Sequence, residues 1–192
     1  MSQVINLFST PIYEAKLSLN IEELQKHCYL YQSQDTGRQV SNRNGWQSHF
    51  INLSDKTFLP LYTQILSHMN IYKESLGVVG NIELDALWIN INPPGGNNVA
   101  HVHPGCFISG TVYIQTNNQS GNIYFENPNP VGYDWKAKYF KDSQWNKECN
   151  DTWDFVPSNE VIYLFPSWAK HGVLSNVSNE DRISISFNGS IS

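Results

Sequence analysis

The sequence has no run of about eighteen apolar residues, the length that a membrane-spanning helix needs, so we expect no membrane span. Residues 1–8 also lack the basic and hydrophobic regions of a signal peptide, which predicts a cytoplasmic protein. Charged side chains are few, at 15%, and the net charge is −5, with lysine and arginine scattered along the chain. Duplex nucleic acid is therefore excluded as the main partner, because phosphate neutralisation needs clustered cations.

Cysteine is scarce as well, with Cys28, Cys106 and Cys149 as the three residues of this type. An odd number without C-x-x-C spacing argues against a disulfide framework and against a thiolate zinc site. We expect all three to be reduced and mainly structural. What the chain does have is 40% hydrophobic and 13% aromatic residues, and its 192 residues fit one domain, 1–192.

The N-terminal part, residues 1–80, reads as an edge strand followed by two helices. Residues 4–17 predict a strand that Pro11 confines to a sheet edge. Asn20 is a candidate N-cap with Glu23 three residues later, and a helix is expected over 21–33.

The second helix is expected to begin between Thr57 and Leu59, with Pro60 in its first turn, where proline is tolerated. Its apolar stripe repeats at three and four residues: Phe58, Tyr62, Ile65, Met69, Tyr72 and Leu76. The stretch between the two helices, from Gly37 to Asn52, is polar and predicts mostly loop.

From Gly80 onward the hydrophobic period changes to two, which is typical of strands. Strands are expected at 82–92, 100–103, 107–116, 121–127, 160–166, 171–176 and 182–188. Helices followed by about seven strands indicate a mainly β, α+β protein, an antiparallel sandwich or barrel with the helices against one sheet.

Residues 128–157 form an insertion that is too long for a simple hairpin, and loops of about thirty residues often act as lids. Its aromatic residues could form a lid over a substrate or pack as a satellite core beneath the loop. These residues are Trp135, Tyr139, Trp145 and Trp153.

The chemistry-bearing pattern is His101-Val102-His103 followed by the distant His171. Two histidines at i and i+2 of an extended segment project to the same side. A third imidazole from another strand can then close a site for a first-row metal ion with positions left open. The alternative is that one or more of these histidines only fills the core or the surface.

At this point the sequence resembles a known family, the 2-oxoglutarate- and Fe(II)-dependent oxygenases often found in marine bacteria and their phages, which are similar to prolyl 4-hydroxylases. The motifs that carry the resemblance are Trp88-x-Asn90-x-Asn92, His101-x-His103-Pro104, Ser109-Gly110-x-x-Tyr113, Gly121-x-Ile123-x-Phe125, Phe165-Pro166-Ser167-Trp168-x-x-His171 and Arg182-x-Ser184-x-Ser186. Leu7-Phe8-x-Thr10-Pro11 and Gly45-Trp46-Gln47-Ser48 also fit, so the resemblance covers nearly the whole chain.

The resemblance implies a double-stranded β-helix (jelly-roll, cupin-like) barrel with iron at its mouth. His101 and His171 match the family's histidine ligands, and Arg182 matches the arginine that pairs with the C5 carboxylate of 2-oxoglutarate. Tyr113 matches a tyrosine that donates to the same carboxylate. The alternatives are a surface ion pair for Arg182 and core packing for Tyr113.

Two further residues, Ser184 and Asn92, are expected on the co-substrate side of this site. Amide and hydroxyl groups at these positions could orient 2-oxoglutarate or the substrate by hydrogen bonds.

The sequence departs from the family pattern at His103, where an aspartate ligand is expected. Three readings follow: His103 completes a three-histidine site, Glu126 supplies the carboxylate, or neither ligates and a chloride or water fills the position. The three-histidine site is favoured, and it would leave Fe(II) with its full charge of +2.

The resemblance implies hydroxylation of a small-molecule or peptide substrate, such as a peptidyl proline, with O2 consumed and 2-oxoglutarate converted to succinate. It would take place in the cytoplasm, that of the host if a phage encodes the chain, and a homodimer stays open. Two other functions are considered: a cupin-like three-histidine metalloprotein without 2-oxoglutarate, and a non-catalytic β-barrel binding module.

Overall fold

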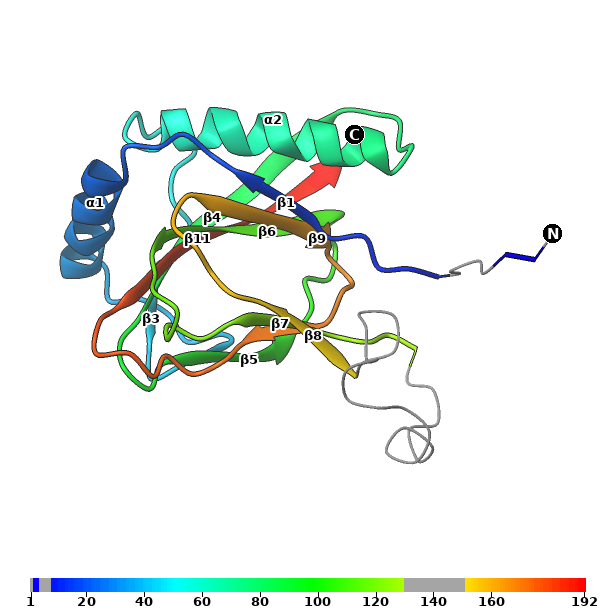
Figure 1. The fold of residues 1–192 in the computed structure, drawn as a ribbon. Helices are drawn as coiled ribbons and strands as arrows, with labels where there is room; N and C mark the ends of the chain where they lie inside the picture. Colours follow the sequence, from blue (N-terminus) through cyan, green and yellow to red (C-terminus); the bar gives the residue numbers. More distant parts are fainter. Residues whose placement is uncertain (1, 4–7, 130–150) are drawn as a thin grey trace, which may run out of the picture.

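Two antiparallel β-sheets lie face to face in the computed structural model, which describes residues 2–3, 8–129 and 151–192 (Figure 1). In spatial order the larger sheet consists of β1 (Tyr13–Lys16), β9 (Val161–Pro166), β6 (Ile108–Gln115), β11 (Arg182–Ile191), β4 (Ile82–Asn92) and β3 (Trp46–Gln47). The smaller sheet consists of β2 (Asn42–Arg43), β5 (Asn97–His101), β10 (His171–Val173), β7 (Ile123–Glu126) and β8 (Thr152–Phe155). The expected mainly β, α+β fold is confirmed. Two facing sheets are also what the predicted double-stranded β-helix requires, but they do not close into a barrel, because no strand of the described residues pairs from one sheet to the other.

The strands lie where the sequence places them, but several predicted limits were wrong. Only Tyr13–Lys16 of the expected strand 4–17 pairs, at the sheet edge that Pro11 predicts, and residues 4–7 lie outside the described part. Strand β5 begins at Asn97, inside the expected turn, because Arg43 and Asn97 pair across β2 and β5.

The polar stretch after the first helix also contributes two short strands, β2 and β3. In the predicted insertion, β8 pairs with β7, so the two strands form a hairpin with a long connection and Trp153 belongs to a sheet. The proposed lid residues Trp135, Tyr139 and Trp145 lie outside the described residues.

The helices α1 (Ile21–Gln34) and α2 (Leu59–Ser75) confirm the capping and spacing arguments. The Asn20 side chain accepts from the backbone N–H of Glu23 and donates to its carboxylate at 2.9 Å, a reciprocal cap. Helix α2 carries Pro60 in its first turn and covers the outer face of the larger sheet (Figure 1). No helix in the described ranges is long and apolar enough to cross a membrane.

The two longest strands, β4 and β11, give the larger sheet one apolar face and one polar face. Their apolar residues join the helices in one buried cluster: Leu87, Ile89, Ile91, Ile183, Ile185 and Phe187. Their alternate residues point between the sheets and are mainly polar: Trp88, Asn90, Arg182, Ser184, Ser186 and Asn188. Because successive side chains of a strand point to opposite faces, this alternation places polar groups inside the sandwich.

A second, smaller apolar cluster lies between the two sheets and joins them. Its buried residues are Tyr113, Ile123, Phe125, Val161, Tyr163, Phe165 and Ala169. It fills only part of the inner space, so a cavity of about 290 Å³ remains beside it.

The helix-covered core predicts where stability resides. Ile65 of α2 is fully buried, and Ile65→Ala should lower the free energy of unfolding by about 2–5 kcal/mol through lost burial and a cavity. Ile71, on the same helix, is 48% exposed, and Ile71→Ala should change this free energy by less than about 0.5 kcal/mol. Urea unfolding of both variants measures the difference, and equal losses would contradict this assignment of the core.

Candidate metal centre and co-substrate site

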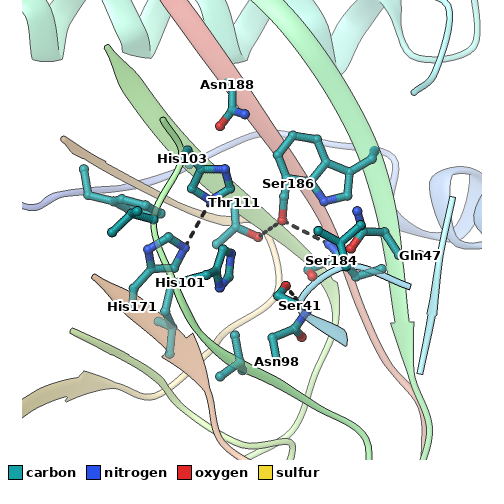
Figure 2. A pocket seen from close by; sticks show the side chains of 18 of the residues that line it. Ser41, Gln47, Asn98, His101, His103, Thr111, His171, Ser184, Ser186 and Asn188 are labelled. Carbon is teal, nitrogen blue, oxygen red and sulfur yellow. Dashed lines mark hydrogen bonds between the residues drawn. The ribbon is translucent and has the colours of Figure 1, made fainter. Parts of the chain in front are cut away.

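Three histidines, two in the smaller sheet and one in the loop after β5, converge at one end of the cavity (Figure 2). His101 ends β5, His171 begins β10, and the two residues are partners in the register of these strands. His103 lies in the loop that follows β5, and its backbone N–H donates to Ser167 O at 2.9 Å. One ring nitrogen from each histidine lies within 4.8 Å of the other two.

Backbone carbonyls fix the tautomers of two of these rings. Nδ1 of His101 lies 2.8 Å from Val99 O, and Nδ1 of His171 lies 2.9 Å from Ala169 O. A carbonyl oxygen only accepts, so each Nδ1 carries the hydrogen and each Nε2 keeps its lone pair. This arrangement prepares Nε2 of both rings to bind a metal ion.

The three imidazoles are neutral near pH 7, which is the state that binds a metal. Burial lowers the pKa of His171 to about 3 and that of His103 to about 4, and the neighbouring His101 adds to both shifts. Burial also lowers the pKa of His101.

The cluster has the dimensions of a first-row metal site. Nε2 of His103 lies 3.4 Å from Nε2 of His171. Metal–nitrogen bonds of about 2.0–2.1 Å place neighbouring ligand nitrogens about 3 Å apart, so a metal ion fits between these rings with little movement.

The structure does not bring Glu126 into this cluster. Glu126 pairs with Lys170 Nζ at 2.7 Å at the end of β7. The preceding Phe125 points inward, against His171 and Phe165, so strand alternation turns Glu126 to the other face. Among the described residues, no carboxylate shares the metal-ligand cluster of the three histidines.

Arg182 lies at the start of β11 and is 1% exposed, so it is not a residue of the surface, as the ion-pair alternative requires. Its Nη1 donates to Ser120 O, to Leu174 O at 3.0 Å and to Gly121 O at 3.5 Å. Its Nη2 is buried and has no hydrogen-bond partner. A buried cation with an unsatisfied donor is costly, so this guanidinium is built to meet an anion.

Tyr113 and Ser184 are opposite each other on β6 and β11 and line the cavity. The Tyr113 ring packs in the inter-sheet cluster, while its hydroxyl has no hydrogen-bond partner among the described residues. Burial raises the pKa of Tyr113 and the nearby positive charge of Arg182 acts to lower it, so the tyrosine stays protonated and can donate from its hydroxyl close to the guanidinium. Core packing and a free hydroxyl are therefore combined in one residue.

Asn92, by contrast, is buried away from the cavity lining. Its side-chain Nδ2 lies 3.5 Å from Asn97 O, and its backbone carbonyl accepts from Asn176 at 2.9 Å. The structure thus places Asn92 in the support of the β4–β5 turn, opposite Arg182 in the register of β4 and β11 but outside the residues that line the cavity.

Sequence reasoning assigned no role to several residues that line the cavity. Arg38, Gln47 and Phe50 come from the polar stretch before α2. Asn90, which the motif Trp88-x-Asn90-x-Asn92 singles out, donates to Ser186 Oγ at 3.1 Å, and its Oδ1 is buried without a partner. Ser186 donates to Thr111 at 3.3 Å (Figure 2). The one signal for the polar stretch was the motif Gly45-Trp46-Gln47-Ser48.

The remaining histidines lie outside the cavity. His49 forms a hydrogen bond with the Asp35 carboxylate, and His68 forms one with the Tyr13 hydroxyl. Nε2 of His27 lies 4.0 Å from Oε1 of Glu23.

Comparisons with solved structures show the same fold in other proteins. A prolyl-4-hydroxylase from Pseudomonas putida aligns over 97% of this chain and 96% of its own, with a TM-score of 0.65 and 12% identity. A prolyl hydroxylase from Trichoplax adhaerens, in complex with a hypoxia inducible factor peptide, aligns over 97% and 85%, with a TM-score of 0.66 and 18% identity. HygX from Streptomyces hygroscopicus, with nickel and 2-oxoglutarate bound, aligns over 95% and 84%, with a TM-score of 0.64 and 10% identity.

Residues 86–188, more than half of the chain, match the sequence profile of a family described as "Putative 2OG-Fe(II) oxygenase". The chain therefore belongs to the 2-oxoglutarate- and Fe(II)-dependent oxygenases and is an oxidoreductase that uses both cofactors. No curated protein matches the sequence. The family assignment argues against the cupin-like and non-catalytic alternatives.

The three-carbonyl support of Arg182 leads to a prediction about Gly121. A Cβ on Gly121 would lie 2.2 Å from Leu174 O and 2.8 Å from Arg182 Nη1, and the residue has φ +88°. Gly121→Ala should therefore displace the guanidinium and weaken 2-oxoglutarate binding by about tenfold or more, while metal affinity changes little. Calorimetric titration of zinc-loaded protein with 2-oxoglutarate measures this.

Gly77→Ala is the matched control, because Gly77 also has a positive φ, +69°, but open space around its Cβ. Both variants carry the same backbone cost, and only Gly121→Ala reaches the arginine. Equal 2-oxoglutarate affinities in the two variants would show that the carbonyl support does not position Arg182.

Proposed function

We propose that this chain is a dioxygenase that hydroxylates a C–H bond of a substrate bound in the cavity, with the metal held by His101, His103 and His171. The observation that carries the proposal is the convergence of three imidazole nitrogens within 4.8 Å in a site without a carboxylate in its described part. Two of the three rings offer an unprotonated Nε2. Three neutral ligands suit Fe(II) and leave coordination positions for other ligands.

The co-substrate would lie between the metal and Arg182. The free Nη2 of Arg182 and the free hydroxyl of Tyr113 are two donors for the far carboxylate of 2-oxoglutarate. Ser184, on the same inner face of β11, adds a hydroxyl beside them. When bound, iron supplies the redox chemistry that couples the oxidation of 2-oxoglutarate to succinate with hydroxylation of the substrate.

The protein residues contribute orientation and exclusion of water. Ile123, Phe165 and Val173 give the cavity an apolar side against which the chain of 2-oxoglutarate can lie. The carbonyl contacts of Arg182 hold its guanidinium before the co-substrate arrives, so little order is lost on binding.

The substrate class follows in outline. At about 290 Å³ the cavity is near the lower limit of ligand pockets, so it admits a small molecule or one residue of a peptide, such as proline. The similar prolyl hydroxylase in complex with a peptide supports the second possibility. Free Cys28 and Cys106 fit a reducing compartment, and we place the enzyme in the cytoplasm.

The proposed chemistry predicts a direct assay. Iron-loaded protein kept free of oxygen should develop a weak visible absorption band when 2-oxoglutarate is added, and admission of air should yield succinate. Arg182→Gln should weaken 2-oxoglutarate binding by about tenfold or more, with iron binding unchanged, because it removes a charge-assisted contact. Arg43→Gln, which removes an exposed charge, is the control. Absence of both the band and succinate from the wild type would reject the function.

The ligand assignment predicts different metal contents for two variants. His103→Ala should lower iron affinity by more than about tenfold, a loss seen even for changes to groups behind the ligands. Glu126→Ala should keep wild-type iron content, because that carboxylate pairs with Lys170. Metal analysis of dialysed protein by mass spectrometry decides this, and iron loss confined to Glu126→Ala would establish a carboxylate site instead.

A further inference from the structure

Arg182 is not among the residues that line the cavity, and the cation that does line it has no part in the proposed chemistry. Apart from the neutral histidines, Arg38 is the one ionisable basic side chain among the described residues that line it, and no aspartate or glutamate lines that part. The chain as a whole carries a net charge of −5. Although the chain is acidic overall, a cavity whose described lining has an arginine and no carboxylate has a local potential that favours anions.

The guanidinium of Arg38 is held in place before any ligand arrives. It stacks over the Phe50 ring, with Cζ 4.1 Å from the ring centroid, and its Nε donates to Ser48 O at 3.2 Å. The backbone N–H of Arg38 donates to Gln47 O at 2.8 Å, which ties the residue to β3. Stacking and these two hydrogen bonds restrict the side chain, so little conformational entropy remains to be lost on binding.

The two terminal nitrogens of Arg38 remain available. Within the described residues they have no hydrogen-bond partner, and no carboxylate lies within ion-pair distance. The nearby Asp35 is engaged elsewhere: it accepts from the backbone N–H groups of Gly37 and His49 and contacts Nδ1 of His49. Burial lowers the pKa of Arg38, while Asp35 acts to raise it, as expected for a partly desolvated cation without a direct partner.

An aromatic wall connects this cation to the metal centre. The Phe50 ring lies 6.0 Å from Trp88, and Trp88 lies 5.9 Å from the His103 ring, measured between centroids. All three residues line the cavity. A molecule lying along this wall has one end at Arg38 and the other at the metal ligands.

We infer that the substrate is a small carboxylic acid, or a residue that carries a carboxylate, whose acid group binds the terminal nitrogens of Arg38 while its apolar body lies on Phe50 and Trp88. The planar guanidinium matches the two oxygens of a carboxylate. A phosphate would bring a second charge, and the described cavity lining has no second cation near Arg38 to meet it.

This inference deepens the proposed function and rests on it for the identity of the reaction, but the anion site can be tested alone. The co-substrate has its own cation, Arg182, which lies on β11, whereas Arg38 lies in the segment between α1 and β2. A ligand bound at one arginine therefore leaves the other arginine available to a second ligand.

The test compares acids with their neutral amides on zinc-loaded protein saturated with 2-oxoglutarate. The probes are phenylacetate with phenylacetamide, and N-acetylproline with N-acetylprolinamide, titrated by saturation-transfer difference NMR. In the wild type, at least one acid should bind about tenfold tighter than its amide, the factor that a charge-assisted hydrogen bond contributes. Arg38→Gln should abolish this preference and Arg38→Lys should keep part of it.

Arg43→Gln is the matched control, since it removes the same charge five residues further along the chain. The Arg43 side chain donates hydrogen bonds to backbone carbonyls and does not line the cavity. It should retain the wild-type preference. The inference is overturned if acids and amides bind the wild type equally, if neither binds, or if Arg38→Gln keeps the preference. Tighter binding of phenyl phosphate than of phenylacetate would overturn the carboxylate assignment.

Titration with 2-oxoglutarate on the same samples separates the two ideas. If the wild type prefers the acids but does not bind 2-oxoglutarate, the proposed function fails and the anion site stands. If 2-oxoglutarate binds and the acid preference is absent, the anion site fails and the proposed function stands.

Discussion

The alternation of side chains along β4 and β11 is the constraint on which the rest of the molecule depends. In most β-sandwiches both inner faces are apolar and form the core. Here the apolar positions of these strands face outward and pack under α1 and α2. The helices therefore make the main core outside the sandwich, and the inner face can carry Asn90, Ser184 and Ser186. A polar cavity and a stable fold coexist because they use opposite faces of the same strands.

Backbone carbonyls, rather than other side chains, orient the charged and ligating groups of the site. Val99 O and Ala169 O set the tautomers of His101 and His171, and three carbonyls hold Nη1 of Arg182. These carbonyls lie in β5 or within three residues of β7 or β10, and backbone groups tied to strands in this way define the geometry of a site more firmly than exposed side chains do. They accept hydrogen bonds without adding negative charge, which leaves the positive charge of Arg182 available to a ligand.

Much of the fold and of the metal site could be predicted from the sequence because those parts have a periodic or ordered signal. The period of two in β4 and β11 and the cap at Asn20 are examples of local patterns with a physical cause. Asn92 shows the limit: its spacing from Asn90 predicts the same face, but the turn before β5 occupies its amide. Arg38 and Gln47 could not be predicted, because the pairing of Gln47 with Asn90 depends on tertiary structure and their stretch has no period.

The charge of the cavity links His103, which departs from the family pattern, to Arg38. In the proposed three-histidine site a histidine stands in place of an aspartate, so Fe(II) bound there would keep its full charge of +2, in a site that also has the cations Arg182 and Arg38. The described cavity lining offers no carboxylate to offset this positive charge, and in a space of low dielectric such charges interact strongly. The dianionic co-substrate would neutralise part of it, and the acidic substrate proposed for Arg38 would neutralise more. In the proposed site His103 and Arg38 would thus act in the same direction, since both would make a negatively charged substrate more favourable than a neutral one of the same shape.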